Sequence, residues 1–344
     1  MTLPPPASAG TILTVTLNLA LDVTYQTRDV DWNGVNRVRA VHRRAGGKGV
    51  NVARVLAALG RRVLVTGLAG GAVGDAARAD LAACGLPAAL TPITGESRTT
   101  LTVSDLSPGG AAQRTALFNE PGPVVSAGEL DGFAGALEER LRRGGIAVAV
   151  ISGSMPPGVP ADFYATLTGR ARAHGVPVIV DADGEALRHA PAGRPAIVKP
   201  NAEELARALS AAPGPAGSDG SRGASGPARP DDPGQALRGA RALMETGAGS
   251  VVVSLGADGL LAVTPEGAWR AAMPYRVEGN PTGAGDALVA GLALGLAEGT
   301  PWPDRLRRAA ALGAAAVAAP VAGDIDGDVL REVEPGIRIE PVCD

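Results

Sequence analysis

The sequence predicts an α/β protein built on one doubly wound, mostly parallel sheet flanked by helices, with a small β lid beside it. Two observations predict the main sheet. Short apolar runs rich in β-branched residues alternate with longer amphipathic stretches. Hydrophobic residues make up 45% of the 344 residues but aromatic residues only 3%, so Ala, Val and Leu fill the core. A third observation predicts the lid: polar and apolar residues alternate around 22–44 and 98–118, as in strands with one solvent-exposed face.

The first half of the chain supplies the start of the sheet and the whole lid. A buried strand is predicted at residues 11–17, because the run is short, apolar and β-branched. A helix is expected at 49–59, where the apolar residues share one face and Gly60 supplies a stop signal. The other predicted elements of this half are a strand at 62–67, a helix at 76–83, and lid strands at 99–103 and 114–117 joined by a turn at 107–110.

The second half continues the alternation without a domain boundary, so residues 11–340 are predicted to form one domain. Strands are expected at 146–152, 176–181, 196–198 and 250–255, and helices at 130–143, 160–173, 235–245 and 288–297. The stretch 211–234 differs, because Gly, Pro, Ser and Ala dominate it without apolar periodicity. It is predicted to be a flexible surface insertion.

Composition excludes several classes of function. The formal charge of −3 gives no support to a nucleic-acid or anionic-membrane partner. The 2 cysteines and 3 histidines have no metal-ligand spacing. The first residues lack the basic and apolar regions of a signal peptide, and no apolar run is long enough to span a membrane. A cytoplasmic protein is therefore expected.

The sharpest chemical feature is the turn Gly283-Ala284-Gly285-Asp286, which opens a helical run. Free backbone N–H groups at the start of a helix can surround an anion, and the helix dipole adds positive charge there. An aspartate at that point could take a proton from a substrate hydroxyl while the N–H groups hold phosphoryl oxygens. The alternative is a glycine-rich turn in which Asp286 serves only as a helix cap.

No Walker loop and no dinucleotide fingerprint occurs in the sequence, so phosphate must be handled by another device. Residues 282–286, Thr-Gly-Ala-Gly-Asp, resemble the C-terminal signature of the PfkB carbohydrate kinases. Residues 45–53, which contain Gly-Gly-Lys-Gly and Asn51, resemble the N-terminal signature of the same family. The resemblance implies a ribokinase-like fold, ATP and Mg²⁺ as cofactors, and transfer of a phosphoryl group to a sugar.

The resemblance also implies roles for individual residues. The catalytic set consists of Asp286 as general base and the anion hole of Gly283, Ala284 and Gly285. Substrate-binding roles fall on Asp22, Gly46, Gly47, Lys48, Asn51, Arg98, Asn119 and Ser152. Within this set, Lys48 and the bidentate Arg98 would meet a phosphate already on the sugar. ATP-binding roles fall on Lys199, Asn201, Glu204, Ser254, Gly256, Gly259 and Asn280.

Magnesium is expected near Asn201 and Glu204, which stand in an N-x-x-E pattern. Since Mg²⁺ keeps much of its hydration, these two residues would position it through water. Read without the resemblance, Glu204 could equally pair charges on the first turn of a helix.

Four short stretches are most similar to the branch of 1-phosphofructokinases and tagatose-6-phosphate kinases. They are residues 16–22, 36–38, 96–99 and 119–122. The branch implies a hexose phosphate as acceptor, most of all fructose 1-phosphate, which would become fructose 1,6-bisphosphate. Tagatose 6-phosphate, fructose 6-phosphate and an unphosphorylated sugar or nucleoside stay open as acceptors.

Two other classes of function also stay open. A non-catalytic sensor of sugar phosphates could use the same fold, although Asp286 and its glycines are present. A dehydrogenase of similar topology is disfavoured by the missing dinucleotide fingerprint. Because amphipathic lid strands leave exposed sheet edges, the partners expected are the sugar phosphate, ATP and a second copy of the chain, paired through the lid.

Overall fold

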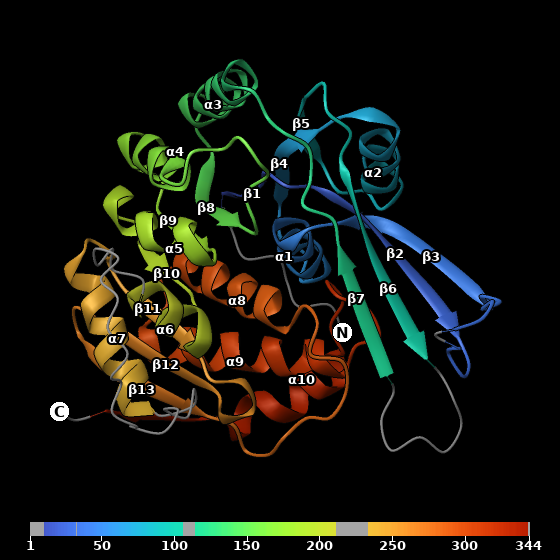
Figure 1. Cartoon of the computed structure of the whole chain (residues 1–344). Coiled ribbons are helices and arrows are strands. Elements are labelled where there is room, and N and C mark those ends of the chain that lie inside the picture. Colours follow the sequence, from blue (N-terminus) through green and yellow to red (C-terminus); the bar gives the residue numbers. More distant parts are fainter. Residues whose placement is uncertain (1–9, 32, 106–113, 211–232, 343–344) are drawn as a thin grey trace, which may run out of the picture.

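The computed structural model describes residues 10–31, 33–105, 114–210 and 233–342. Its main body is a ten-stranded sheet, with strand order β14-β13-β12-β11-β10-β9-β8-β1-β4-β5 (Figure 1). The strands are β1 (Thr11–Thr16), β4 (Val63–Ala69), β5 (Ala88–Pro92), β8 (Ile146–Ser152), β9 (Val178–Asp181), β10 (Ile197–Val198), β11 (Val251–Ser254), β12 (Leu260–Thr264), β13 (Gly267–Ala272) and β14 (Arg338–Pro341). Neighbours from β11 to β5 are parallel, and β12, β13 and β14 extend the sheet antiparallel. The predicted doubly wound, mostly parallel α/β sheet is confirmed.

Helices cover both faces of this sheet. One face carries α1 (Lys48–Ala58), α2 (Gly71–Ala83), α8 (Ala284–Glu298), α9 (Trp302–Ala318) and α10 (Gly327–Val333). The other face carries α3 (Ala127–Arg142), α4 (Phe163–Ala173), α5 (Gly184–His189), α6 (Ala202–Ser210) and α7 (Pro233–Glu245). The described residues also form three short 3-10 helices: η1 (Ala190–Gly193), η2 (Gly256–Asp258) and η3 (Glu334–Gly336).

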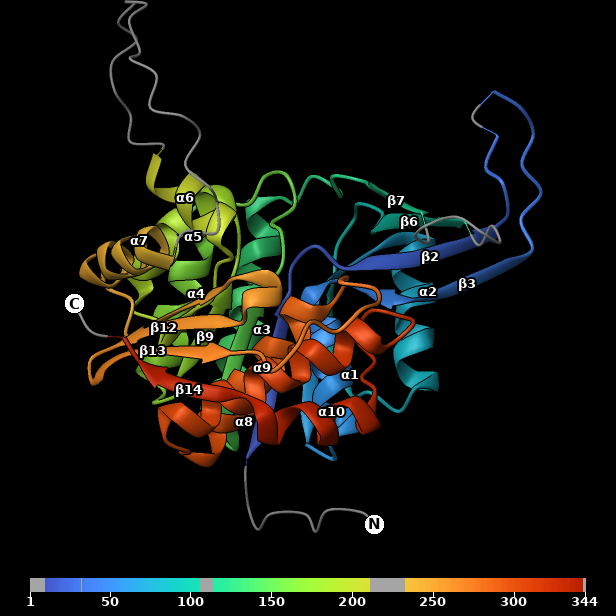
Figure 2. The same cartoon turned by 90° about the horizontal axis from the view of Figure 1, so that it is seen from below.

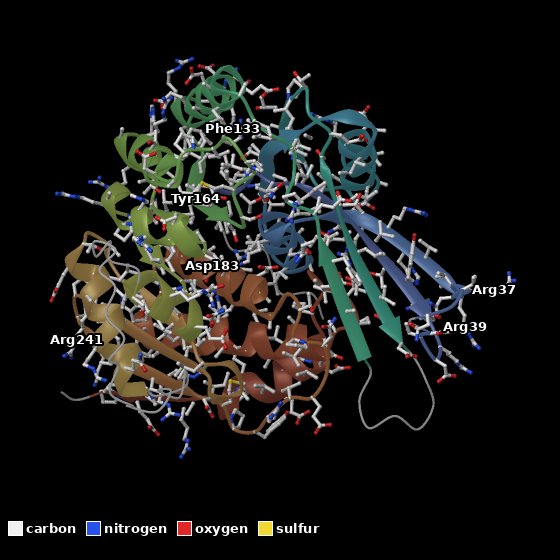
Figure 3. The ribbon with its side chains drawn as sticks, in the orientation of Figure 1. Arg37, Arg39, Phe133, Tyr164, Asp183 and Arg241 are labelled. Atoms are coloured by element: carbon white, nitrogen blue, oxygen red, sulfur yellow. The ribbon has the colours of Figure 1, made fainter. Side chains whose placement is uncertain are left out.

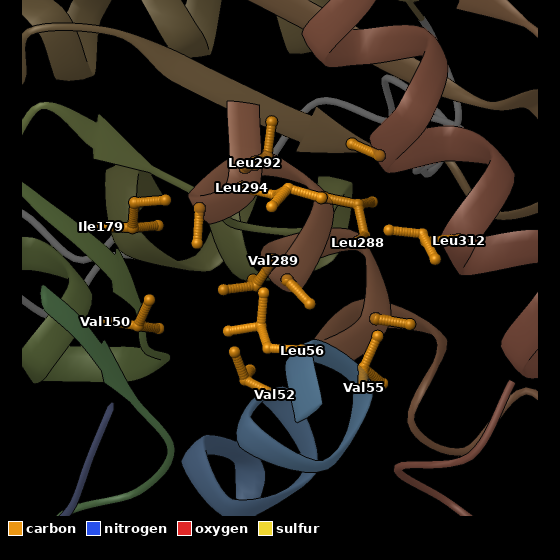
Figure 4. Packing of buried hydrophobic residues seen from close by; sticks show 14 of the residues in the cluster. Val52, Val55, Leu56, Val150, Ile179, Leu288, Val289, Leu292, Leu294 and Leu312 are labelled. Carbon is orange, nitrogen blue, oxygen red and sulfur yellow. The ribbon is translucent and has the colours of Figure 1, made fainter. Parts of the chain in front are cut away.

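The core beneath α1 and α8 fixes the position of the turn at residues 283–286. Val52 and Leu56 of α1 and Val289 of α8 are fully buried and belong to one cluster with Val150 of β8 (Figure 4). Because α8 is apolar on all sides, it is buried along most of its length. Its first turn is therefore held firmly against the sheet.

The second sheet is the lid, with strand order β3-β2-β6-β7. Its strands are β2 (Ala20–Thr27), β3 (Ala40–Gly46), β6 (Arg98–Asp105) and β7 (Arg114–Asn119). The pairs β2–β3 and β6–β7 are antiparallel, and β2 pairs with β6 in parallel. The lid lies on the side of the molecule opposite α7 and the antiparallel strands (Figures 1 and 2). Arg37 and Arg39 lie at its far end (Figure 3).

Several boundaries differ from those predicted. Helix α2 begins at Gly71, before residue 76, because the Glu96 carboxylate accepts a hydrogen bond from the Val73 N–H and satisfies the start of the helix. Helix α7 begins at Pro233, so the last two residues of the stretch 211–234 are helical. The rest of that stretch and the turn at 107–110 lie outside the described residues. No helix in the described part of the chain is long and apolar enough to cross a membrane.

The order of the strands places the site. The chain runs outward from β1 to β4 and β5, then returns to β8 and proceeds the other way. Ligands of open α/β sheets bind at such a reversal, outside the carboxyl ends of the strands. Here that point lies between β1 and β8, beside the lid.

Candidate active site

A cavity of about 680 Å³ opens at the carboxyl ends of the central strands. Its lining combines residues from the strand ends, the lid, the N-terminus of α1 and the turn at residues 283–286. Among the residues expected from the sequence, it includes Asp22, Gly47, Lys48, Asn51, Arg98, Asn119, Lys199, Asn201, Glu204, Ser254, Gly283, Gly285 and Asp286. The fold therefore brings most of the expected residues into one place.

Asp286 lies in the first turn of α8 and is only 6% exposed. Asn51 of α1 donates a hydrogen bond from Nδ2 to Asp286 Oδ2 at 2.8 Å. Burial, reinforced by the negative charge of Asp181, raises the pKa of Asp286 to about 7. Lys48, the Asn51 hydrogen bond and Lys199 oppose this rise. A carboxyl with a pKa near neutrality is suited to accept a proton at physiological pH.

The turn before Asp286 presents the start of α8 to the cavity. Gly283 is the N-cap residue and has a φ of 88°, a conformation that favours glycine. A Cβ at this position would also lie 2.9 Å from Ala322, so the turn packs closely against the loop after α9. The N–H groups of the first helical turn lack partners within the helix, and this end of the dipole is positive. The arrangement can hold a phosphoryl group beside Asp286.

Asp181 is a central residue that the sequence analysis missed. It ends β9, is 1% exposed, and forms ion pairs with Lys199 at 3.1 Å and Lys48 at 3.4 Å. Burial alone would raise the pKa of Asp181, but the two lysines and the Ser152 hydroxyl together lower it. The same charge raises the pKa of Lys48. The signal was present, since an aspartate directly follows the buried run Val-Ile-Val.

Ser152 ends strand β8, but its side chain does not line the cavity as its expected substrate-binding role requires. Its side chain is fully buried and donates a hydrogen bond to Asp181 Oδ2 at 3.1 Å. The next serine, Ser154, lines the cavity instead. The physical reason is that β8 still has strand geometry at Ser152, which points the side chain inward, whereas Gly153 leaves the strand with a φ of 109°.

The N-x-x-E pattern forms a reciprocal helix cap at the start of α6. Asn201 Oδ1 accepts from the Glu204 N–H, and Glu204 Oε2 accepts from the Asn201 N–H, both at 2.8 Å. Glu204 is 8% exposed and lies in the cavity wall. The described residues contain no group of three or more acidic, histidine or cysteine side chains able to hold a metal. One carboxylate beside a phosphate site fits a magnesium ion that stays mostly hydrated.

On the lid side, Asp22 stands at the base of β2. A Cβ at Gly46 would lie 2.1 Å from its carboxylate, so Gly46 gives Asp22 its room and lies behind the cavity wall. Burial raises the pKa of Asp22, while Arg98 and Arg44 oppose the rise. Asn119, which ends β7, lies opposite Thr100 on the same sheet face. Asp22, Thr100 and Asn119 thus offer hydrogen-bond donors and acceptors on the lid face that lines the cavity.

Arg98 joins the lid to the main body. Its Nε donates to the Asn18 carbonyl at 3.2 Å and its Nη1 to the Glu120 carbonyl at 3.0 Å. Asn18 Nδ2 in turn donates to the Pro121 carbonyl and to Ser154 Oγ. Asn18 and Ser154 were not expected as site residues. Both follow buried strands, which is the signal that could have identified them.

The remaining expected residues lie around the cavity and are not part of its lining. Asn280 Oδ1 accepts from the Thr282 N–H at 3.0 Å and so shapes the approach to the catalytic turn. Gly259 has a φ of 94°, and a Cβ there would lie 2.0 Å from the Ala271 carbonyl, which indicates a structural turn. Gly256 begins η2 with a φ of 61°, and Ala284 begins α8.

Comparison with known proteins shows the family of the chain. The family model described as pfkB family carbohydrate kinase matches residues 16–325. Phosphofructokinase-2 from Escherichia coli, solved with potassium, is 30% identical, with a TM-score of 0.81 over 95% of this chain and 98% of that one. Another structure of that enzyme, 29% identical with a TM-score of 0.78, contains fructose-6-phosphate and covers 95% and 98% of the two chains.

Two further structures show how far the similarity extends. A protein from Thermotoga maritima described as a possible 1-phosphofructokinase is 25% identical, with a TM-score of 0.80 over 97% of this chain and all of that one. Ribokinase from Arabidopsis thaliana, solved with ribose and ATP, is 17% identical, with a TM-score of 0.65 over 94% and 98% of the two chains. The similarity to this ribokinase shows only that the two chains share a fold.

Proposed function

The chain belongs to the pfkB family of carbohydrate kinases, and from this premise we propose that it transfers the γ-phosphoryl group of ATP to fructose 1-phosphate. The product would be fructose 1,6-bisphosphate. The observation that carries the proposal is Asp286: a buried carboxyl with a pKa of about 7, at the start of a helix and inside the cavity shared by the lid and the sheet. That combination supplies a general base next to an anion site.

In the proposed reaction Asp286 accepts the proton of the acceptor hydroxyl as that oxygen attacks the γ-phosphorus. The bond from phosphorus to the bridging oxygen of ATP breaks, and ADP leaves. Because the transition state is loose, catalysis consists mainly of positioning and charge stabilisation. The N–H groups of Gly283 and Gly285, which line the cavity, are available to hold the phosphoryl oxygens, whereas the Ala284 N–H donates to the Pro281 carbonyl at 3.2 Å.

The two lysines add positive charge to the same space. Lys48 and Lys199 both pair with Asp181, which fixes their ammonium groups beside the cavity. A phosphate that enters the cavity can contact both without a large rearrangement. We therefore assign Lys48 and Lys199 to phosphate binding, and Asp181 to holding them in place.

Magnesium fits beside Glu204, with Asn201 holding the carboxylate in place. When bound, the ion would neutralise charge on the ATP phosphates. The residues on the nucleotide side, Ser254 at the end of β11 and Asn201 beside it, form a parallel bridge. This bridge lines the cavity wall on which we place the ATP phosphates.

A phosphorylated acceptor is supported by the polar groups on the lid side. Asp22, Asn119 and Ser154 are placed to bind sugar hydroxyls, and Arg98 supplies a guanidinium for the acceptor phosphate. Fructose 6-phosphate and tagatose 6-phosphate present the same chemical groups in another order. An unphosphorylated sugar would make no use of the Arg98 guanidinium, whose charge is then balanced only by Asp22 and Glu120.

Replacement of Asp286 tests the reaction. In the Asp286→Asn variant we expect kcat to fall about 10²-fold or more, because an amide cannot accept the proton. The acceptor Kd should change little, and calorimetry with fructose 1-phosphate checks it. A variant that keeps more than about a tenth of the wild-type kcat would contradict the role of Asp286 as general base.

The acceptor is tested by an ADP-release assay on a panel of sugars. The panel compares fructose 1-phosphate, fructose 6-phosphate, tagatose 6-phosphate, fructose and ribose. We expect the highest kcat/KM with fructose 1-phosphate, and the Arg98→Met variant should lose the preference for phosphorylated acceptors. A higher kcat/KM with free fructose or ribose would reverse the assignment.

A further inference from the structure

Asn18 lies just after strand β1 and connects three parts of the active-site wall. The residue is 4% exposed and lines the cavity. Its Nδ2 donates to the Pro121 carbonyl at 3.0 Å and to Ser154 Oγ at 3.1 Å, and its main-chain carbonyl accepts from Arg98 Nε at 3.2 Å. One buried residue therefore contacts the loop after β7, the turn after β8 and the guanidinium that we assign to the acceptor phosphate.

The Pro121 carbonyl determines which way the Asn18 amide points. A carbonyl oxygen is only an acceptor, so the amide atom that lies 3.0 Å from it must carry a proton. That atom is Nδ2, and its second N–H is directed at Ser154 Oγ. The hydrogen bond between the two side chains thus runs from the Asn18 amide to the Ser154 oxygen, which is the acceptor in it.

The proton of the Ser154 hydroxyl is consequently left for a ligand. A serine hydroxyl carries one proton to donate besides its acceptor lone pairs. This proton cannot point at Asn18, because both N–H groups of that amide are directed at acceptors. Ser154 is exposed and lines the cavity, and within the described chain its hydroxyl is bonded to Asn18. The proton can therefore be donated to an oxygen of the bound acceptor.

The other end of the amide indicates that Asn18 does more than fill space. Asn18 Oδ1 is buried and has no hydrogen-bond partner among the described residues. It lies against Gly122, where a Cβ would be 2.2 Å away. A buried acceptor without a donor costs free energy, so an apolar side chain of the same shape would serve packing better. What the amide adds is its pair of N–H groups, one of which acts on Ser154.

We propose that Asn18 is a positioning residue that determines acceptor specificity: it holds the Ser154 hydroxyl as a donor, beside Arg98, toward an anionic phosphate oxygen of the acceptor. The inference rests on the proposed function and names the group that selects the acceptor class. A hydrogen bond to a charged oxygen is stronger than one to a neutral hydroxyl oxygen. A free sugar can accept the same bond but gains less from it. Asn18 acts through Ser154 and need not contact the acceptor itself.

A double-mutant cycle between Asn18 and Ser154 tests this role. Asn18→Leu keeps the approximate shape of the side chain and the main-chain carbonyl that Arg98 uses, but removes both N–H groups. We expect Asn18→Leu and Ser154→Ala each to raise the KM and the calorimetric Kd for fructose 1-phosphate about fivefold or more. In the double variant the second change should add less than about twofold, because the hydroxyl through which Asn18 acts is already gone. Single effects that multiply in the double variant would contradict the inference.

The preference between acceptors separates specificity from support of the fold. In Asn18→Leu, the ratio of kcat/KM for fructose 1-phosphate to kcat/KM for fructose should fall about fivefold or more. Tyr164→Phe is the matched control, because the Tyr164 hydroxyl donates to the Gly153 carbonyl at 3.1 Å and supports the same turn without bonding the Ser154 hydroxyl. We expect this control to keep the wild-type ratio. An equal fall of both kcat/KM values in Asn18→Leu would show that Asn18 has a structural role alone.

A second substitution and the unmodified protein complete the test. Asn18→Ala repeats the cycle with a smaller side chain, so a folding defect in Asn18→Leu does not decide the outcome. Circular dichroism checks that each variant is folded. An unmodified protein without turnover on the sugar panel would overturn the proposed function. Turnover of a phosphorylated sugar, together with single effects that multiply, would overturn the role of Asn18 and leave the proposed function intact.

Discussion

At the scale of single residues, the proposed role of Asp286 as general base makes the activity depend on the protonation of this carboxyl. Its folded pKa is raised from 3.8 to about 7 by burial and by Asp181. The base must be deprotonated, so activity is present above the folded pKa and is lost as the pH falls through it. We expect kcat/KM to drop tenfold per pH unit below about pH 7. Initial rates measured with saturating ATP between pH 5.5 and 9 give the acidic limb of this pH profile, in which kcat/KM falls with pH.

Asn51 offers an independent test of the same titration. Its hydrogen bond to Asp286 Oδ2 favours the charged carboxylate and so lowers the pKa. In Asn51→Ala the hydrogen bond that lowers the pKa of Asp286 is lost. The pKa of Asp286 should then rise, and the acidic limb of the kcat/KM profile should move to higher pH. A limb that stays in place in this variant would assign the titration to another group. Asn51→Asp is unsuitable as a control because it adds a like charge.

Residue chemistry also explains how the N-x-x-E pattern can cap a helix and serve the proposed magnesium site at once. The side chains of Asn201 and Glu204 cap helix α6 through their mutual hydrogen bonds. This fixes the carboxylate in the cavity wall without a separate supporting residue. The structural reading and the functional reading of that pattern are therefore compatible, since the cap positions the group that would face magnesium.

At the scale of elements, the junction between α8 and the loop after α9 holds the turn in which we propose the anion site. Gly283→Ala would place a Cβ 2.9 Å from Ala322 at a φ of 88°. We expect loss of about 1–3 kcal/mol of unfolding free energy and a fall in kcat, because the first turn of α8 must move. Urea unfolding and the ADP-release assay measure the two effects.

The same helix supplies a matched control at its other end. Gly299 caps α8 with a φ of 66°, and a Cβ there would meet nothing within 4 Å. Gly299→Ala therefore introduces a similar backbone strain without the contact with Ala322. It should lower stability and leave kcat near the wild-type value. Equal losses of kcat in both variants would show that the effect of Gly283→Ala comes from destabilisation alone.

At the scale of the whole molecule, the lid leaves two sheet edges, β3 and β7, and apolar side chains on its surface. Leu117 is 46% and Phe118 50% exposed, on opposite faces of β7. We expect a homodimer formed through the lid, since exposed strands with apolar faces favour pairing. Sedimentation velocity measures the mass.

Substitutions on each face of β7 locate the interface. Leu117→Arg or Phe118→Arg should convert the dimer to a monomer, depending on which face is covered. Val124→Arg serves as the control, because Val124 is 74% exposed and lies outside the lid strands. A wild-type protein of monomeric mass, or dimers in both β7 variants, would show that the lid does not pair.

The sequence by itself determined the α/β class, the lid and the residues of both signatures, because each depends on local patterns. Apolar runs, the alternation of polar and apolar residues, and glycine turns each involve residues that are close together in the sequence. The catalytic role of Asp286 was likewise expected from its place after Gly283 and Gly285. Helix α8 begins in that turn, as the motif indicated.

Only the tertiary structure decided which side chains share the cavity and which support it from behind. Ser152 and Ser154 are alike in sequence, yet the inward direction of β8 buries one and leaves the other on the cavity wall. The ion pairs of Asp181 with Lys48 and Lys199 became visible only in the structure, where Asp181 ends β9 between the two lysines. The link from Arg98 through Asn18 to Ser154 joins segments distant in the chain. Such contacts depend on how strands and helices pack, and packing is not encoded by any one local pattern.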